Sequence, residues 1–134
     1  MDRHRAPARP GHGGAGTHRG GLGQVISVRN TTGRPWQVAL LGDREHHPPR
    51  GLLGGSPALG TAAAIDGEPV SPVKPVTPLA PDVTVDLLFA GGAGFGFADQ
   101  RDPAAVTADV RLGYLTPEAA ARDYPGHDPQ RNTQ

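Results

Sequence analysis

Residues 90–124 read AGGAGFGFADQRDPAAVTADVRLGYLTPEAAARDY and contain the clearest structural signals of the chain. Asp102-Pro103 predicts the start of a helix, because an aspartate N-cap accepts hydrogen bonds from free backbone N–H groups and proline has no N–H to leave unpaired. Gly113 lies where a left-handed residue would end that helix. Thr116-Pro117 repeats the start signal, so a second short helix is expected to end before Pro125.

The glycine-rich run is preceded by the best strand of the sequence. Residues 83–89 read VTVDLLF, and apolar side chains alternate with polar ones in the first half of this run. Such a period of two is typical of a strand with one buried face. The side chains expected to point inward are Val83, Val85, Leu87 and Phe89.

Two further alternating runs lie in the N-terminal third. Gln24–Arg29 (QVISVR) and Trp36–Leu41 (WQVALL) each place every second side chain on an apolar face. Residues 30–35, which join them, are rich in turn formers. Two alternating runs with such a connection predict an antiparallel hairpin.

The segment between residues 42 and 82 is predicted to be mostly loop. Eight prolines from Pro48 to Pro81 remove backbone donors that a central strand needs. Within this segment Asp66-Gly67 stands between apolar residues. This pair favours a two-residue turn that needs positive φ.

The predicted fold is α+β: mainly β with two short C-terminal helices, arranged as a small antiparallel sheet or partial sandwich rich in loops. A chain of 134 residues forms at most one domain, and its 20 glycines and 15 prolines indicate loose packing. We expect a flexible basic arm at residues 1–18, a folded module at residues 19–125 and a disordered tail at residues 126–134.

Composition excludes several classes of function. Basic and acidic residues, 13 of each, give no net charge to attract nucleic acid or an anionic membrane. Cysteine is absent, which excludes a disulfide framework, a thiol nucleophile and a cysteine zinc site. No apolar run follows the basic N-terminus, and the longest uncharged stretch, residues 51–65, is too short to span a bilayer. We therefore expect a soluble, cytoplasmic protein.

Several further motifs follow one another in a specific order. Residues 13–23 read GGAGTHRGGLG, residues 43–57 read DREHHPPRGLLGGSP, and residues 66–69 read DGEP. They are similar to a G-A-G-x-x-R-G-G-L-G run, a D-R-x-x-x-x-P-x-G-x-x-G-G-x-P-G loop and an Asn-Gly turn of the hydantoinase B/oxoprolinase family. The helices between residues 101 and 122 resemble the end of the same family, so the resemblance covers residues 11–124.

This resemblance implies a parent enzyme like N-methylhydantoinase B, 5-oxoprolinase or the B subunits of acetone and acetophenone carboxylases. Their ATP-dependent reactions open a cyclic amide or carboxylate a ketone. ATP and a divalent metal are implied for the complete complex, with the ATP chemistry mainly in a partner A subunit. The metal-binding His/Asp cluster of the carboxylases lies upstream of the matching part. We therefore expect this chain to hold no metal, no cofactor and no catalytic residue.

The sequence departs from the family where the glycine-rich turn ends. The family reads T-P-G-G-G-G-Y-G-D-P there, whereas residues 89–98 read FAGGAGFGFA, with Phe97-Ala98 in place of Asp-Pro. Three interpretations stay open. The chain is a C-terminal module or fragment of a B subunit, structural or pocket-lining and inactive alone; an assembly module; or a non-functional truncated remnant. The expected partner is a hydantoinase A-type subunit or a separately encoded N-terminal half of the B subunit.

Two glycine-rich loops are candidates for lining a substrate pocket. In the first, Arg19 has the shape to bind a carboxylate through two hydrogen bonds, while Gly21 and Gly23 let the backbone approach a neighbour closely. The second loop has glycines whose N–H groups suit an anion, but its spacing is not G-x-G-x-x-G and no Walker lysine follows. We favour tight packing for both loops over ligand binding. The candidate residues of the second loop are Gly92, Gly94 and Gly96.

The third candidate loop, residues 43–47, is the densest polar cluster of the chain. His46 or its neighbour His47 has the chemistry of a general base, but adjacent histidines on extended backbone point to opposite faces and do not easily bind one metal. We favour a solvated loop that is shaped by an ion pair between Asp43 and Arg44.

Overall fold

The computed structural model describes residues 2–5 and 13–126. Seven strands, one 3-10 helix and two α-helices follow one another along these parts of the chain. Most of the described secondary structure is therefore strand, and the predicted α+β class is confirmed. In chain order the elements are β1 (Asp2–Arg5), β2 (Gln24–Arg29), β3 (Trp36–Leu41), β4 (Ala62–Ile65), β5 (Glu68–Val70), β6 (Val73–Leu79), β7 (Thr84–Phe89), η1 (Ala98–Gln100), α1 (Pro103–Arg111) and α2 (Pro117–Asp123).

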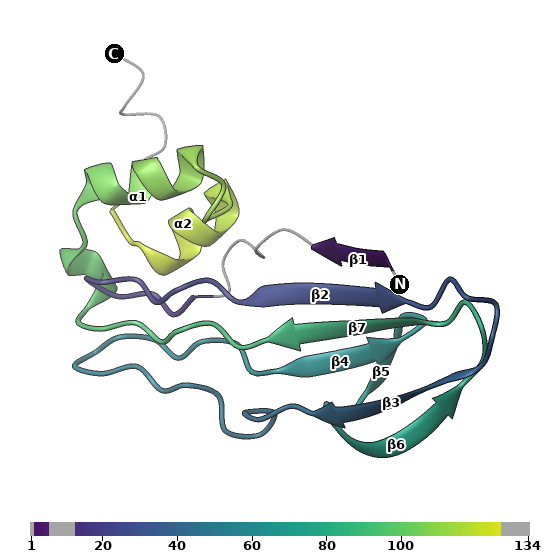
Figure 1. Cartoon of the computed structure of the whole chain (residues 1–134). Coiled ribbons are helices and arrows are strands. Elements are labelled where there is room, and N and C mark those ends of the chain that lie inside the picture. The colour runs from purple at the N-terminus through teal and green to yellow at the C-terminus, as the bar shows by residue number, and fades with distance from the viewer. Residues whose placement is uncertain (1, 6–12, 127–134) are drawn as a thin grey trace.

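The strands form two antiparallel sheets that pack against each other as a partial sandwich (Figure 1). The larger sheet has five strands in the order β1-β2-β7-β4-β5, and the smaller sheet pairs β3 with β6. Leu40, Ala63 and Val85 are buried between the sheets, and this apolar burial stabilises the sandwich. The partly buried side chains around them are Trp36, Val38, Ile65, Val70, Leu79 and Leu87.

Strands β2 and β3 have the predicted bounds but do not form the predicted hairpin. Strand β2 pairs with β7, from Gln24 opposite Phe89 to Arg29 opposite Thr84. Each run has an apolar face, and placing the two runs in opposite sheets buries both faces against one core. The connection crosses between the sheets, and the Asn30 side chain shapes it by donating to the Arg34 carbonyl at 2.7 Å.

Most of the segment between residues 42 and 82 is loop, as predicted, but strands β4, β5 and β6 also lie there and were not predicted. The prolines do not prevent this, since Pro69 lies in the edge strand β5 and Pro75 and Pro78 lie in the two-stranded sheet. An edge position has no ladder hydrogen bond to lose on its outer side. The turn at Asp66-Gly67 is confirmed: φ is 48° and 82° at these residues, which join β4 to β5.

Two further predictions differ from the structure near the ends of elements. Phe89 was expected to point inward, but it is 41% exposed, because β7 leaves the sandwich there. The flexible arm was expected to reach His18, whereas β1 pairs with β2 and Ala15 is buried. The remainder of the predicted arm, residues 1 and 6–12, and of the disordered tail, residues 127–134, lies outside the described residues.

Beyond the sandwich, three extended segments lie side by side and form what we call the glycine layer: residues 13–21, 51–56 and 91–96 (Figure 1). Backbone groups join the segments directly. Gly92 donates to the Gly21 carbonyl at 2.8 Å, Gly94 donates to the Ser56 carbonyl at 2.9 Å, and Ser56 donates to the Ala15 carbonyl at 2.7 Å. The glycine layer continues strands β2, β4 and β7 away from the sandwich.

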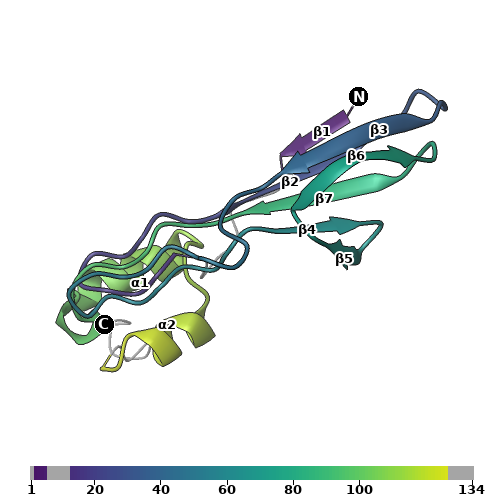
Figure 2. The ribbon, with the colours of Figure 1, turned by 90° about the horizontal axis from the view of Figure 1, so that it is seen from below.

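Helices α1 and α2 cover one face of the glycine layer (Figure 2). Both predicted caps are present: Asp102 accepts from the Ala104 N–H at 2.9 Å, and Thr116 accepts from the Ala119 N–H at 3.1 Å. Gly113, with φ of 75°, follows α1 as expected. The helices supply most of a second buried cluster that also includes Ala15 of the glycine layer; its helical and adjoining members are Val106, Leu115, Ala119, Ala120 and Tyr124.

Candidate functional site

The structure brings together two of the three loops that the sequence singled out. The loops around Arg19 and Gly92 are neighbours in the glycine layer, where Gly92 donates to Gly21 and accepts from Gly14 at 2.9 Å. The loop at residues 43–47 instead follows the end of β3 and contacts residues near the start of β4, where Thr61 donates to a loop carbonyl at 3.3 Å. The three loops therefore do not converge on one pocket.

The glycines of the layer are needed for backbone packing, as the favoured interpretation predicted. A Cβ atom on Gly94 would overlap the carbonyl oxygen of Ala15, and one on Gly20 would overlap the carbonyl oxygen of Gly92. Gly96 has φ of 73°, a conformation that only glycine adopts readily. Gly21 differs, because nothing lies within 4 Å of the place where its Cβ would be. Gly23, the last candidate of its loop, is buried.

A buried charged cluster ties the helices to the glycine layer. Asp109 of α1 binds Arg19 through two hydrogen bonds, Nε to Oδ2 at 2.9 Å and an Nη to Oδ1 at 3.3 Å. Arg101 donates to the same Oδ2 at 2.8 Å and to the Thr17 carbonyl at 3.1 Å. The carboxylate that the sequence predicted for Arg19 is therefore supplied by the chain itself.

The cluster is shielded from solvent and flanked by aromatic rings. Asp109 is 7% exposed, and the guanidinium groups lie over the rings of Tyr114 and Tyr124, 5.6 and 5.9 Å from the centroids. Burial raises the pKa of the Tyr124 hydroxyl, although the nearby Arg101 charge lowers it. A low-dielectric setting strengthens these ion pairs and makes each charge costly to leave alone. The cluster is therefore a structural joint.

Sequence reasoning missed Asp109 and Arg101 as members of this cluster. Asp109 follows Val106 by three positions and therefore shares its buried helix face. An acidic residue on such a face needs a cationic partner. That pairing requirement was the available signal, but it did not identify Arg19, which lies 90 residues away in the sequence.

The loop at residues 43–47 has a different arrangement from the one expected. No ion pair joins the Asp43 and Arg44 side chains within the described parts of the chain; the Asp43 carboxylate instead accepts from the Arg44 backbone N–H at 2.7 Å. Arg44 has φ of 67°, which turns its side chain away from a straight strand. His46 is exposed, and its Nε2 lies 3.6 Å from a Glu45 carboxylate oxygen that also accepts from Ser71.

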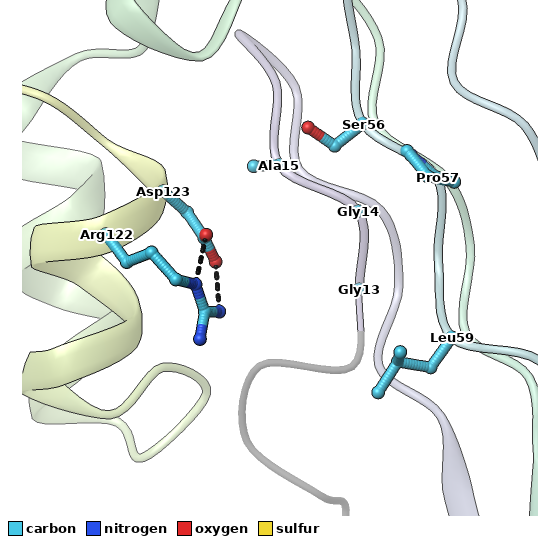
Figure 3. A pocket seen from close by; sticks show the side chains of 8 residues that line it. All are labelled: Gly13, Gly14, Ala15, Ser56, Pro57, Leu59, Arg122 and Asp123. Atoms are coloured by element: carbon cyan, nitrogen blue, oxygen red, sulfur yellow. Dashed lines mark hydrogen bonds and ion pairs between the residues drawn. The ribbon is translucent and has the colours of Figure 1, made fainter.

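A pocket of about 320 Å³ lies between the glycine layer and α2 (Figure 3). Arg122 and Asp123 form its charged wall and bind each other through two hydrogen bonds of 2.7 Å. Those hydrogen bonds, together with the Asp123 charge, raise the pKa of the Arg122 guanidinium. The charges of Arg122 and Asp123 are therefore neutralised by each other. The remaining lining residues are Gly13, Gly14, Ala15, Ser56, Pro57 and Leu59.

The described residues do not fit a divalent metal. Residues 13–126 contain no group of three histidine, cysteine or carboxylate side chains placed to hold one ion. Zinc sites in proteins use three or four such ligands. In the same parts of the chain no helix has the length and hydrophobicity required to cross a bilayer.

Comparisons with known proteins agree on one family and one fold. The family model described as hydantoinase B/oxoprolinase matches residues 3–98. An ATP-dependent caprolactamase from Pseudomonas jessenii has a similar structure, with a TM-score of 0.76 and 23% identity over 90% of this chain and 22% of that chain. A nucleotide-free acetone carboxylase gives a TM-score of 0.64 and 21% identity over 92% of this chain and 21% of that chain. No curated protein matches.

Proposed function

Because the chain belongs to the hydantoinase B/oxoprolinase family, we propose that it is a C-terminal module of a hydantoinase B-type subunit and serves as a scaffold. One observation carries this proposal: about nine-tenths of the chain matches structures of which it spans only 21% and 22%. In those enzymes this fold makes up about a fifth of a longer chain. Its contribution is shape and support for the remainder.

The use of charged residues supports a scaffolding role. Arg19, Arg101 and Asp109 are taken up in one buried cluster, and Arg122 is paired with Asp123. A catalytic acid or base needs a shifted pKa and access to substrate. Tyr124 has a raised pKa, but it is 2% exposed and packs in the helix cluster.

The parent reaction in this proposal is the ATP-dependent opening of a cyclic amide, or a related carboxylation. The names of the caprolactamase and the acetone carboxylase support these two reaction types. ATP and a divalent metal would be bound by the rest of the subunit and by a hydantoinase A-type partner. A cytoplasmic location fits the absence of cysteine.

Assays of the purified chain test the scaffolding role. We expect neither ATP hydrolysis nor ring opening of 5-oxoproline, hydantoin or caprolactam by the chain alone. We expect the chain to bind the caprolactamase chain from which the matching fifth has been removed. Turnover by the chain alone would contradict the proposal, and so would a failure to bind the shortened chain.

A second candidate is an assembly module that works beside a separately encoded N-terminal half of the subunit. It is favoured by large apolar side chains that the described structure leaves open to solvent, since such surfaces mark interaction sites. Leu41, Leu53 and Phe97 are 89%, 72% and 57% exposed. Binding of the chain to a separately encoded half, but not to a hydantoinase A-type subunit, would support this candidate.

A further inference from the structure

Strand β3 has an outer edge that no described strand covers. Within residues 2–5 and 13–126 it pairs only with β6. Gly42, which follows β3, donates toward this partner side, to the Pro72 carbonyl at 2.7 Å. Backbone groups of successive residues in a strand point in opposite directions, so the outward N–H and C=O groups belong to every second residue before Gly42. These residues are Gln37, Ala39 and Leu41, and all three are exposed.

The opposite edge of the small sheet is blocked. Strand β6 contains Pro75 and Pro78, which lack N–H groups, and the register shift between Val38 and Leu40 places an extra residue on β6. Proline and bulges are the means by which proteins protect an edge against pairing. Strand β3 has neither feature, so its edge remains open to another strand.

The larger sheet is incompletely covered on the same side. Ile26 and Val28 lie opposite Leu87 and Val85 in the β2–β7 ladder, and residues directly opposite in such a ladder share a face. Val85 and Leu87 contribute to the sandwich core, but Ile26 and Val28 lie outside that cluster and are only half-buried. Within the described residues the small sheet ends at β3 on this side, and Figure 2 draws β3 in front of β2 and near β1. A strand added at the outer edge of β3 would therefore extend the cover across β2 toward β1.

The end of this edge also offers space for a side chain. A cavity of about 120 Å³ lies beside the end of β3, and its lining includes Leu41 and Phe89, which are 89% and 41% exposed. Its lining is mainly apolar, and its volume suits one large apolar side chain. The other lining residues are Ala39, Leu40, Gly42, Thr61, Pro72 and Leu87.

We propose that the outer edge of β3 receives an extended strand of the polypeptide that completes the hydantoinase B-type subunit. This inference rests on the proposed function, because the occupant is the part of the subunit that this chain does not contain. The added strand hydrogen-bonds to Gln37, Ala39 and Leu41 and carries apolar side chains at alternate positions. Those side chains cover Ile26 and Val28, and one of them fills the cavity beside β3. Main-chain pairing of this kind supplies affinity, and the pockets supply specificity.

Amide hydrogen exchange of the full chain tests the geometry directly. In the chain alone, the amides of Gln37, Ala39 and Leu41 exchange faster than those of Trp36, Val38 and Leu40, which face β6. Addition of the caprolactamase chain lacking the matching fifth slows the three outward amides at least about tenfold. Slow exchange of these amides in the monomeric chain alone would show that the outer edge of β3 is already paired, and would overturn the proposal.

A proline substitution tests the pairing by a second route. Ala39→Pro removes one outward N–H without removing a hydrogen bond to β6, and we expect about tenfold weaker binding of the shortened caprolactamase chain. The matched control Ala39→Thr keeps the N–H and binds like the unchanged chain. Thermal unfolding of both variants checks that they fold, and the exchange experiment stands on its own if Ala39→Pro does not.

The outcomes separate this inference from the proposed function. Binding with unchanged exchange at Gln37, Ala39 and Leu41, and with equal affinity for Ala39→Pro, would overturn the β3 site and leave the scaffolding role intact. Absence of binding would contradict both. Protection that rises with the concentration of the chain alone, together with dimers in light scattering, would identify a second copy as the occupant and would also overturn the proposal.

Discussion

In the sandwich, side chains fill the space between the sheets, whereas in the glycine layer the contacts run between backbone atoms. Leu40 and Val85 are nearly inaccessible, and they exclude water by burying apolar surface. In the glycine layer, Gly20 and Gly94 lie so close to neighbouring carbonyl groups that a Cβ atom has no room. The sandwich therefore depends on the volume of its side chains, and the glycine layer depends on their absence.

This difference explains why the helices lie where they do. A layer of glycine backbone has few side chains with which to form a core, so the apolar surface must come from another element. Val106, Leu115 and Tyr124 supply it. The ion pairs from Arg19 and Arg101 to Asp109 then hold the helices in place. The two sheets of the sandwich supply all the side chains of their own core, whereas most of the core beside the glycine layer comes from the helices.

The largest effect is expected at the joint between helix and glycine layer. Asp109→Ala leaves Arg19 and Arg101 buried without their carboxylate, and we expect the free energy of unfolding to fall by about 4 kcal/mol. Denaturant unfolding measures the change. The control Asp99→Ala removes an exposed acid and should change stability by less than about 0.5 kcal/mol. Equal, small effects of both substitutions would show that the cluster does not hold the helices.

A matched pair of glycines tests the glycine layer itself. Gly94→Ala forces a methyl group onto the Ala15 carbonyl, and we expect a loss of about 3 kcal/mol because backbone must move. Gly21→Ala meets no atom within 4 Å and should be neutral or stabilising by about 0.5 kcal/mol. The free energies of unfolding of the two variants check this. A tolerated Gly94→Ala would contradict backbone packing as the basis of the layer.

Adjacent leucines provide the corresponding test in the sandwich. Leu40 is 3% exposed and Leu41 is 89% exposed. Leu40→Ala should cost about 2.5 kcal/mol, in the lower half of the usual range because its neighbours Trp36 and Val38 are only partly buried. Leu41→Ala should change stability of the isolated chain by less than about 0.5 kcal/mol. Similar values for both would mean that the register of β3 differs from the one described.

The smallest expected effect is a change in the stability of the chain at alkaline pH, and it comes from Tyr124. Burial raises the pKa of Tyr124 in the folded chain above its unfolded value of about 10. The folded state then keeps a proton that the unfolded state loses, so this stabilisation is complete below pH of about 10 and declines as pH rises toward the folded pKa. Tyr124→Phe should remove this part of the decline, whereas Tyr114→Phe, at a more exposed ring, should leave it. If the free energy of unfolding depends on alkaline pH in the same way for Tyr124→Phe and for the unchanged chain, the assignment of this decline to Tyr124 is wrong.

Local signals in the sequence identified strands β2, β3 and β7 and both helices, but they identified neither strands β1, β4, β5 and β6 nor the way in which the strands pair. Strands β2 and β3, the turn at Asp66-Gly67 and the cap at Asp102 each depend on neighbouring residues, and the structure confirms them. The buried and exposed residues alternate in β3 but not in β2. Strands β2 and β7 pair through backbone groups of residues that lie 55 to 65 positions apart, and alternation within each strand does not specify which partner it takes.

The candidate site was predictable only in part, for the same reason. The glycines of the two neighbouring loops were identified, and tight packing was the favoured role. Their mutual contact, and the pairing of Arg19 with Asp109, arise only when the helices fold over the glycine layer. The predicted ion pair of Asp43 does not form, because its carboxylate accepts a hydrogen bond from the Arg44 backbone N–H instead. That hydrogen bond does not require the long Arg44 side chain to be ordered.

We expect the sandwich and the glycine layer to unfold together as one cooperative module. Trp36, the single tryptophan, packs against the sandwich core, while the helices lie on the glycine layer. Thermal unfolding followed by tryptophan fluorescence and by far-UV circular dichroism therefore reports on both regions. One sharp transition with the same midpoint for both signals is the predicted result. Separate midpoints, or a broad change with aggregation, would contradict an autonomous module and indicate a detached fragment.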